Sequence, residues 1–154
     1  MSGIALSEVH AASCLCGQVR LRVHGAPSRV GLCHCLDCRK AHAAAFVAFV
    51  IFPTLNVDIT DPEGRALADD RLGSFSRDGQ YLRFFCNACG SHVYGRSKGA
   101  DEIELHLGSF DETNLWTPTY EAWAKRRERW IGDLPTVFQH YPGNRENGPH
   151  DVEG

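Results

Sequence analysis

Apolar and polar positions alternate along several short stretches of this chain, and glycines and prolines separate these stretches. Alternation at 19–23 (VRLRV), 55–59 (LNVDI) and 102–107 (EIELHL) predicts strands with one buried and one solvent-exposed face. The run 46–52 (FVAFVIF) contains no polar position and ends at Pro53, which predicts a strand buried on both faces. The pattern therefore favours a protein built from short strands.

A further apolar stretch leads directly into a pair of cysteines. Residues 81–85 (YLRFF) precede Cys86, the chain turns at Gly90, and residues 91–94 (SHVY) lead away again. A strand, a cysteine turn and a second strand in this order are typical of the zinc-ribbon knuckle.

Helix is scarce in the pattern, and short helices are expected only at 36–44 and 120–130. A chain of 154 residues with 43% apolar content has the size of one domain and can bury a core. We expect this domain at 11–141, between a flexible N-terminus at 1–10 and a flexible polar tail at 142–154. The predicted fold class is mainly β.

All seven cysteines lie in three tight clusters, which are Cys14-x-Cys16, Cys33-x-Cys35-x-x-Cys38 and Cys86-x-x-Cys89. An odd count and spacings of one or two residues argue against disulfides. Glycine and polar neighbours argue against buried apolar thiols, so metal ligation is the favoured interpretation. Seven is the sum of one closed four-thiolate zinc site and one three-ligand site with an open fourth position. The triplet can wrap one ion alone, and the two distant pairs would complete each other.

Charge and hydropathy limit the partners. A net charge of −3 provides no general attraction for nucleic acid or an anionic membrane. No apolar run reaches the roughly 20 residues that a spanning helix needs. The first twelve residues lack the basic and apolar segments of a signal peptide, so we expect a reducing, cytoplasmic location.

The cysteine clusters and their neighbours together resemble a known family. The matching features are Cys14-x-Cys16-Gly17, Cys33-His34-Cys35-x-x-Cys38-Arg39-Lys40, Phe85-Cys86-x-x-Cys89-Gly90 and Gly108-Ser109-Phe110-Asp111. In order and spacing they are similar to the glutathione-dependent formaldehyde-activating enzyme family, which includes centromere protein V. The resemblance covers about residues 11–145. It departs at 41–45 (AHAAA), where many members carry Gly, a small residue and Pro or Ala.

The resemblance implies a zinc-bearing β-tent of antiparallel sheets with two ions. Cys14, Cys16, Cys86 and Cys89 would hold a structural zinc, and the triplet Cys33, Cys35 and Cys38 a catalytic zinc with an open position. The implied activity is that of a carbon–sulfur lyase, which adds glutathione to formaldehyde to give S-hydroxymethylglutathione, or the reverse. Three cysteinates make the ion a weak Lewis acid, so activation of the thiol is favoured over activation of the aldehyde.

Charged and histidine side chains near the triplet have two interpretations each. Arg39 and Lys40 would contact the carboxylates of a peptide-like thiol, or would balance the anionic cysteine clusters. His34, between two ligands, is expected to point away from the metal. His42 lies either on the inner face of a short helix near the open site or on its exposed face.

Two features of the C-terminal third are expected to be structural. The basic stretch 125–129 is diluted by nearby carboxylates and is expected to be a solvated face. Trp116, Trp123 and Trp130 recur every seven residues, and core packing is the favoured role for this stripe.

Two alternatives to the lyase stay open. One is a non-catalytic zinc-binding module with a protein or nucleic-acid partner, although nucleic acid fits the charge poorly. The other is a zinc enzyme that acts on a different small thiol or aldehyde, because fold does not fix substrate. The sequence makes no prediction of oligomeric state.

Overall fold

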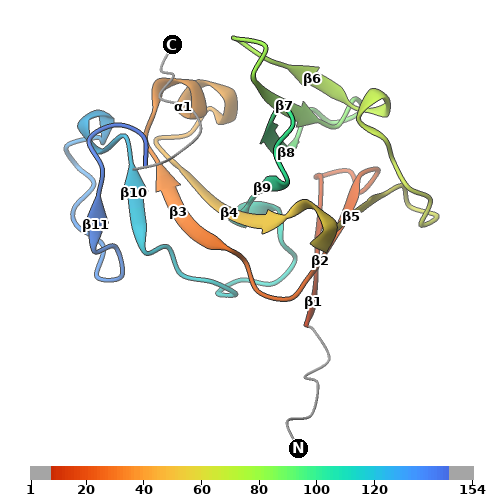
Figure 1. The fold of residues 1–154 in the computed structure, drawn as a ribbon, viewed down its shortest axis with the longest axis horizontal. Helices are drawn as coiled ribbons and strands as arrows, with labels where there is room; N and C mark the ends of the chain where they lie inside the picture. The colour runs from red at the N-terminus through yellow and green to blue at the C-terminus, as the bar shows by residue number, and fades with distance from the viewer. Residues whose placement is uncertain (1–7, 146–154) are drawn as a thin grey trace, which may run out of the picture.

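The computed structural model describes residues 8–145, and strands dominate this part of the chain (Figure 1). The strands are β1 (Val9–Ser13), β2 (Arg20–His24), β3 (Arg29–Cys33), β4 (Val47–Pro53), β5 (Val57–Thr60), β6 (Gly73–Phe75), β7 (Tyr81–Phe85), β8 (His92–Ser97), β9 (Glu102–His106), β10 (Tyr120–Ala122) and β11 (Gln139–His140). The α-helix is α1 (Leu36–His42), and short 3-10 turns lie at Thr54–Asn56, Asp69–Arg71, Leu107–Ser109 and Ala124–Arg126.

The strands form two sheets. β1, β2 and β5 form a three-stranded sheet, and the others form an eight-stranded sheet in the order β11-β10-β3-β4-β9-β8-β7-β6. Figure 1 shows β11 and β6 at opposite ends of the larger sheet. Pairing is antiparallel except that β10 runs parallel to both β3 and β11. The predicted mainly β class is confirmed, and the two parallel pairs make the larger sheet mixed rather than wholly antiparallel.

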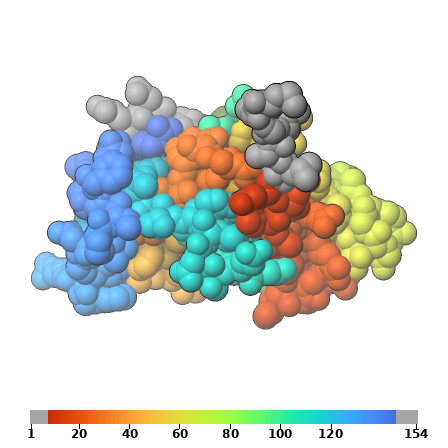
Figure 2. Space-filling view, turned by 90° about the horizontal axis from the view of Figure 1, so that it is seen from below, coloured from red at the N-terminus to blue at the C-terminus, as the bar shows by residue number. Residues whose placement is uncertain are grey.

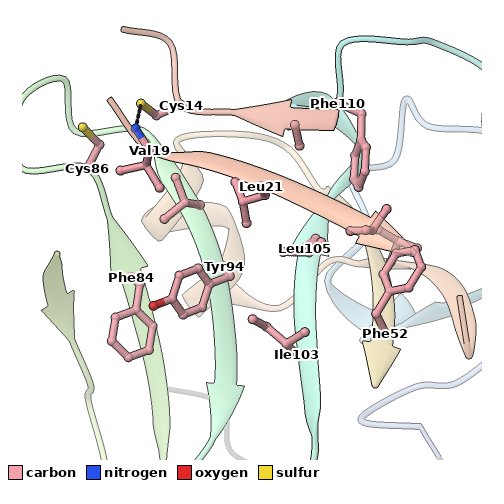
Figure 3. Packing of buried hydrophobic residues seen from close by; sticks show 14 of the residues in the cluster. Cys14, Val19, Leu21, Phe52, Phe84, Cys86, Tyr94, Ile103, Leu105 and Phe110 are labelled. Carbon is pink, nitrogen blue, oxygen red and sulfur yellow. Dashed lines mark hydrogen bonds between the residues drawn. The ribbon is translucent and has the colours of Figure 1, made fainter. Parts of the chain in front are cut away.

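The main hydrophobic core lies between the two sheets. Leu21 and Val23 of β2 are 1% and 0% exposed, while the arginines that alternate with them face solvent. Figure 3 shows Leu21 beside Leu105 of β9, with Ile103 further along the same strand. The alternating pattern of these two strands therefore directs their apolar side chains into one shared core, as the sequence predicts.

β4 is buried on both faces, which confirms the interpretation of its continuous apolar run. Val50 and Phe52 join the main core, whereas Val47, Phe49 and Ile51 join a second cluster on the opposite face of the sheet. The other buried members of this second cluster are Cys33, Cys35, Cys38, Tyr120, Ala122 and Trp123. The second cluster thus surrounds the cysteine triplet with apolar side chains.

The helix expected at 120–130 is wrong. Tyr120–Ala122 forms β10, and all three of its residues are buried between β3 and β11. Trp123 then takes a left-handed conformation with φ 58°, which ends the strand, and only the turn Ala124–Arg126 is helical. Trp123 is 6% exposed and Trp130 74% exposed, so the tryptophan spacing does not mark one packed stripe.

Contacts between distant segments tie the sheets together. Figure 2 shows the teal segment that follows β9 lying against the red N-terminal strands. Ala12 of β1 pairs with Phe110, and the Asp111 N–H donates to the Ala11 carbonyl at 3.0 Å. The end of β1, where the first cysteine pair begins, is therefore fixed against the larger sheet.

Described residues on both sides of the expected domain, 11–141, make contacts with it. β1 begins at Val9, and near the other end the Trp123 N–H donates to the Gly143 carbonyl at 2.8 Å. The remaining parts of the two expected tails, 1–7 and 146–154, lie outside the described residues. No helix within 8–145 is long and apolar enough to span a membrane.

Candidate metal centres and the adjoining pocket

The two distant cysteine pairs meet in space. Cys14 and Cys16 follow β1, and Cys86 and Cys89 follow β7, and their four Sγ atoms all lie within 4.8 Å of one another. The Cys14 and Cys16 sulfurs are 3.6 Å apart, and the Cys16 and Cys86 sulfurs 3.7 Å. Four thiol donors at this spacing fit a tetrahedral zinc with no open position. Figure 3 shows Cys14 and Cys86 side by side at one end of the main core.

The backbone around these pairs is shaped to turn back on the sulfurs. Gly17 and Gly90 have φ values of 80° and 79°, a conformation that favours glycine directly after each pair. The Val19 N–H donates to the Cys14 sulfur at 3.3 Å. The Ser91 hydroxyl accepts from the Leu15 N–H at 3.1 Å and lies 3.2 Å from the Cys89 sulfur, so it links the two halves of the site.

The triplet Cys33, Cys35 and Cys38 forms a second group. Cys33 ends β3, Cys35 caps α1 by accepting from the Cys38 N–H at 3.2 Å, and Cys38 lies in the first turn of α1. The three Sγ atoms lie within 4.8 Å of one another, and within residues 8–145 no histidine, carboxylate or fourth cysteine joins them. All three side chains are buried. The donor set therefore fits a zinc ion with three protein ligands and one free position.

Proton sharing among the three thiols is unequal. The pKa of Cys35 is lowered to about 3, because the Cys33 and Cys38 thiols and the Cys38 N–H donate to its sulfur and Arg83 lies nearby. The pKa of Cys33 is raised, chiefly because its own thiol donates to Cys35 and Cys38 and because it is buried. Binding of an ion by all three sulfurs would therefore release protons.

A cavity of about 200 Å³ opens beside the triplet. The cysteines, apolar residues of the second cluster, and polar side chains from β7, β8 and β9 line it, the last including Tyr81, Arg83, Arg96, Glu102 and Glu104. A small organic molecule in this cavity would contact both the sulfurs and ionisable groups.

Glu104 and Tyr81 form a polar pair in this cavity. The Tyr81 hydroxyl donates to the Glu104 carboxylate. Gly95 lies between them on β8, and a Cβ at that position would come within 2.2 Å of the Tyr81 oxygen, so the absence of a side chain lets the phenol cross the strand. Burial, and then the nearby charge of Cys35, raise the pKa of Glu104 to about 7.

The family model for the glutathione-dependent formaldehyde-activating enzyme matches residues 9–126, which is more than half of the chain. The chain belongs to this family. A solved structure of a Rhodobacter sphaeroides protein is also similar, with a TM-score of 0.50 and 15% identity over 68% of this chain and 91% of that one. At this identity the likeness shows a shared fold.

Arg39 and Lys40 lie away from the cavity beside the triplet. The Arg39 guanidinium donates to Glu128 and to the Arg126 carbonyl, Lys40 is exposed, and neither residue lines the cavity. The cationic side chains that do line it include Arg83, whose Nη2 is 3.8 Å from the Cys38 sulfur, and Arg145. No sequence pattern indicated either residue, because both are far from the triplet along the chain.

His34 is fully buried and turned toward β10. Its ring Nε2 lies 2.9 Å from a Glu121 oxygen, and its backbone N–H donates to the Ala122 carbonyl. The second Glu121 oxygen lies 2.7 Å from His140 Nδ1 and 3.3 Å from an Arg127 nitrogen. Burial raises the pKa of Glu121, but these donors lower it by more than burial raises it, so the net shift is downward. The network clamps the backbone between Cys33 and Cys35, a role that sequence reasoning missed.

The basic stretch 125–129 faces solvent, as expected, since Lys125, Arg126 and Arg129 are exposed, and its charge is partly neutralised. Arg127 pairs with Asp133 at 2.9 Å as well as with Glu121, and the Lys125 ammonium lies 4.7 Å from the centre of the Trp123 ring.

His42 lies on the inner side of α1, in a second cavity with His92 and His106.

Proposed function

We propose that this chain is a carbon–sulfur lyase that adds a thiol, with glutathione as the favoured substrate, to formaldehyde, or catalyses the reverse reaction. The observation that carries the proposal is the cysteine triplet, which offers three sulfurs and no fourth protein ligand within the described residues, and which faces a cavity of about 200 Å³. Family membership supports the same reaction. A cytoplasmic location fits seven free thiols.

Two zinc ions per chain are part of the proposal. Cys14, Cys16, Cys86 and Cys89 would hold the structural ion. Zinc held by Cys33, Cys35 and Cys38 would keep its fourth position for the substrate sulfur and would favour the thiolate form of that substrate.

The protein's own groups would handle the proton. Addition forms a carbon–sulfur bond, breaks the π bond of the carbonyl, and needs one proton removed from sulfur and one delivered to oxygen. Glu104, with a pKa near 7, is suited to take the first proton and to return it to the oxygen. The Tyr81 hydroxyl holds the carboxylate in one orientation.

Arginines of the cavity would bind the carboxylates of the thiol. Arg29 is held by Glu102 through two hydrogen bonds of 2.8 and 2.9 Å, and Arg77 pairs with Asp37 at 3.2 Å. Arg83 contacts the Cys38 sulfur and the face of the Tyr81 ring, and no carboxylate within residues 8–145 pairs with it. Arg145 also lines the cavity and forms no ion pair with a carboxylate among the described residues. Arg83 and Arg145 are therefore the favoured contacts for the substrate carboxylates, in place of Arg39 and Lys40.

Exchange of labelled formaldehyde with glutathione, followed by nuclear magnetic resonance, tests the proposal. Zinc-loaded protein should accelerate exchange, Cys35→Ser should abolish the acceleration, and Glu104→Gln should reduce it by about 100-fold. Arg20→Gln, an exposed arginine of β2 remote from the cavity, is the matched control and should behave as wild type. Absence of acceleration with glutathione would reject this substrate, and absence with every small thiol tested would favour a non-catalytic zinc-binding module.

A further inference from the structure

Three histidines converge in a second cavity, away from the proposed reaction. His42 lies at the end of α1, His92 at the start of β8 and His106 at the end of β9. The His42 ring centre is 4.3 Å from that of His92 and 4.4 Å from that of His106. The cavity has a volume of about 370 Å³, and Ser91 and Ser109 also line it. Segments from three separate parts of the chain thus bring their imidazoles to one place.

Ring nitrogens in this group lack partners. His106 is only 9% exposed, yet its Nδ1 has no hydrogen-bond partner, and the same is true of the buried Nε2 of His42. Leaving a buried polar atom unpaired is unfavourable, because the atom loses its hydrogen bonds to water and gains none in the protein. Two such atoms at one cavity indicate a group that they would bind.

The imidazoles are in the form that binds metal. Burial and the positive charge of Arg83 lower the pKa of all three, and neighbouring imidazoles lower the pKa of His42 and of His106 further, that of His42 to about 4. They are therefore neutral at pH 7, and a neutral imidazole has one nitrogen free to act as a ligand. The His92 ring donates a hydrogen bond to the Ala41 carbonyl, as a ligating histidine commonly does to an outer partner that orients it.

We propose that His42, His92 and His106 form a third metal site, separate from both cysteine clusters, for a divalent transition-metal ion that favours nitrogen ligands, such as Zn²⁺. Among the described residues, only the cysteine clusters have all their ligand atoms within 4.8 Å of one another, so the three rings would have to move closer together to share one ion. Arg83 disfavours a cation here, while the Cys35 charge favours it. Binding is therefore weaker than at the cysteine sites.

Calorimetric titration of the full chain with Zn²⁺, after the cysteine sites have been filled, tests the third site. Wild type should bind one further equivalent, and the ring-nitrogen resonances of the three histidines should shift with it. His42→Ala should weaken this binding at least tenfold. His24→Asn, which changes a half-exposed histidine of β2 paired with Asp58, should leave it unchanged.

A second variant guards against effects on folding. His106 is buried, so His106→Gln is compared with wild type by circular dichroism, while His42 is only half-buried and its variant keeps the test decisive if the first fails to fold. Binding of no further equivalent by wild type would overturn the proposal. An unchanged third equivalent in His42→Ala would overturn it equally. Neither outcome bears on the thiol reaction, which uses the triplet.

Discussion

Removal of the crosslink between the two cysteine pairs should destabilise the protein more than any equal change at the triplet. The perturbation is Cys86→Ser with Cys89→Ser, which leaves Cys14 and Cys16 without the partners that bring the distant pairs together. The matched control is Cys33→Ser with Cys35→Ser, which removes the same number of cysteines from the triplet.

The magnitude follows from the length of chain that each ion closes. Cys16 and Cys86 are 70 residues apart, and closing a loop of that length lowers the entropy of the unfolded chain by the equivalent of about 4 kcal/mol. The triplet closes only the short stretch from Cys33 to Cys38, for which the same relation gives about 2 kcal/mol. Moreover, α1 and the hydrogen bonds of β3 hold that stretch independently.

Thermal unfolding of the zinc-loaded proteins measures the difference. For a chain of this size, a loss of 4 kcal/mol corresponds to a fall in melting temperature of roughly 10 °C. The loss should vanish when wild type and variant are compared in excess chelator, because neither then holds an ion. This second comparison separates the crosslink from the effect of placing serine at the buried position of Cys86.

Equal melting temperatures for the two double variants would show that closing the long loop between the cysteine pairs does not determine the stability. So would a difference that persists unchanged in chelator, because it would then arise from packing of the serines rather than from the ion.

Three further predictions concern the cavities. Gly95→Ala should displace the Tyr81 ring from Glu104 and lower kcat by about tenfold with little change in the melting temperature; steady-state kinetics with unchanged kcat would contradict the proton-transfer role. Arg83→Gln should raise the KM for glutathione roughly tenfold, through loss of a charge-assisted hydrogen bond, and should leave the KM for formaldehyde unchanged; equal effects on both would contradict it. The pKa of His42 is lowered to about 4, so between pH 6.5 and 4 the unfolded chain binds more protons than the folded one, and the free energy of unfolding falls as the pH falls through that window. Urea unfolding at several pH values should show a shallower fall for His42→Gln than for wild type. An identical fall would contradict this assignment.

The sequence was most informative where the chemistry is local. The triplet spans only six residues, from Cys33 at the end of a strand to Cys38 in the first turn of a helix. This short span brings the three sulfurs together independently of the rest of the fold. Counting ligands was enough to predict that the other four cysteines form one cluster. The continuous apolar run of β4 predicted burial on both faces for the same reason, because every position of the run is apolar.

Prediction failed where distant segments decide the outcome. Residues 120–130 contain good helix formers, but β10 gains hydrogen bonds from β3 and β11 on both sides, and no local pattern reports those neighbours. Arg39 is close to the triplet in sequence, yet the helix turns its side chain toward Glu128. Nearness along the chain was therefore a poor guide to the cavity wall.

The polar groups of the cavity illustrate the same limit. Glu104 and Tyr81 are ordinary residues of two alternating strands, and their pairing depends on Gly95 of a third strand. Such a pair can be recognised only when the register of the three strands is known, because the register decides which glycine lies between the tyrosine and the carboxylate.

Cadmium-113 nuclear magnetic resonance of the cadmium-substituted protein tests whether the triplet takes the substrate sulfur, because the shift of each ion reports the number of sulfurs around it. We expect separate signals from the closed four-cysteine site and from the triplet, and on addition of glutathione only the triplet signal should move, toward that of a four-sulfur site. A triplet signal that does not respond to glutathione or to any other small thiol would contradict the claim that this site takes the sulfur of the substrate.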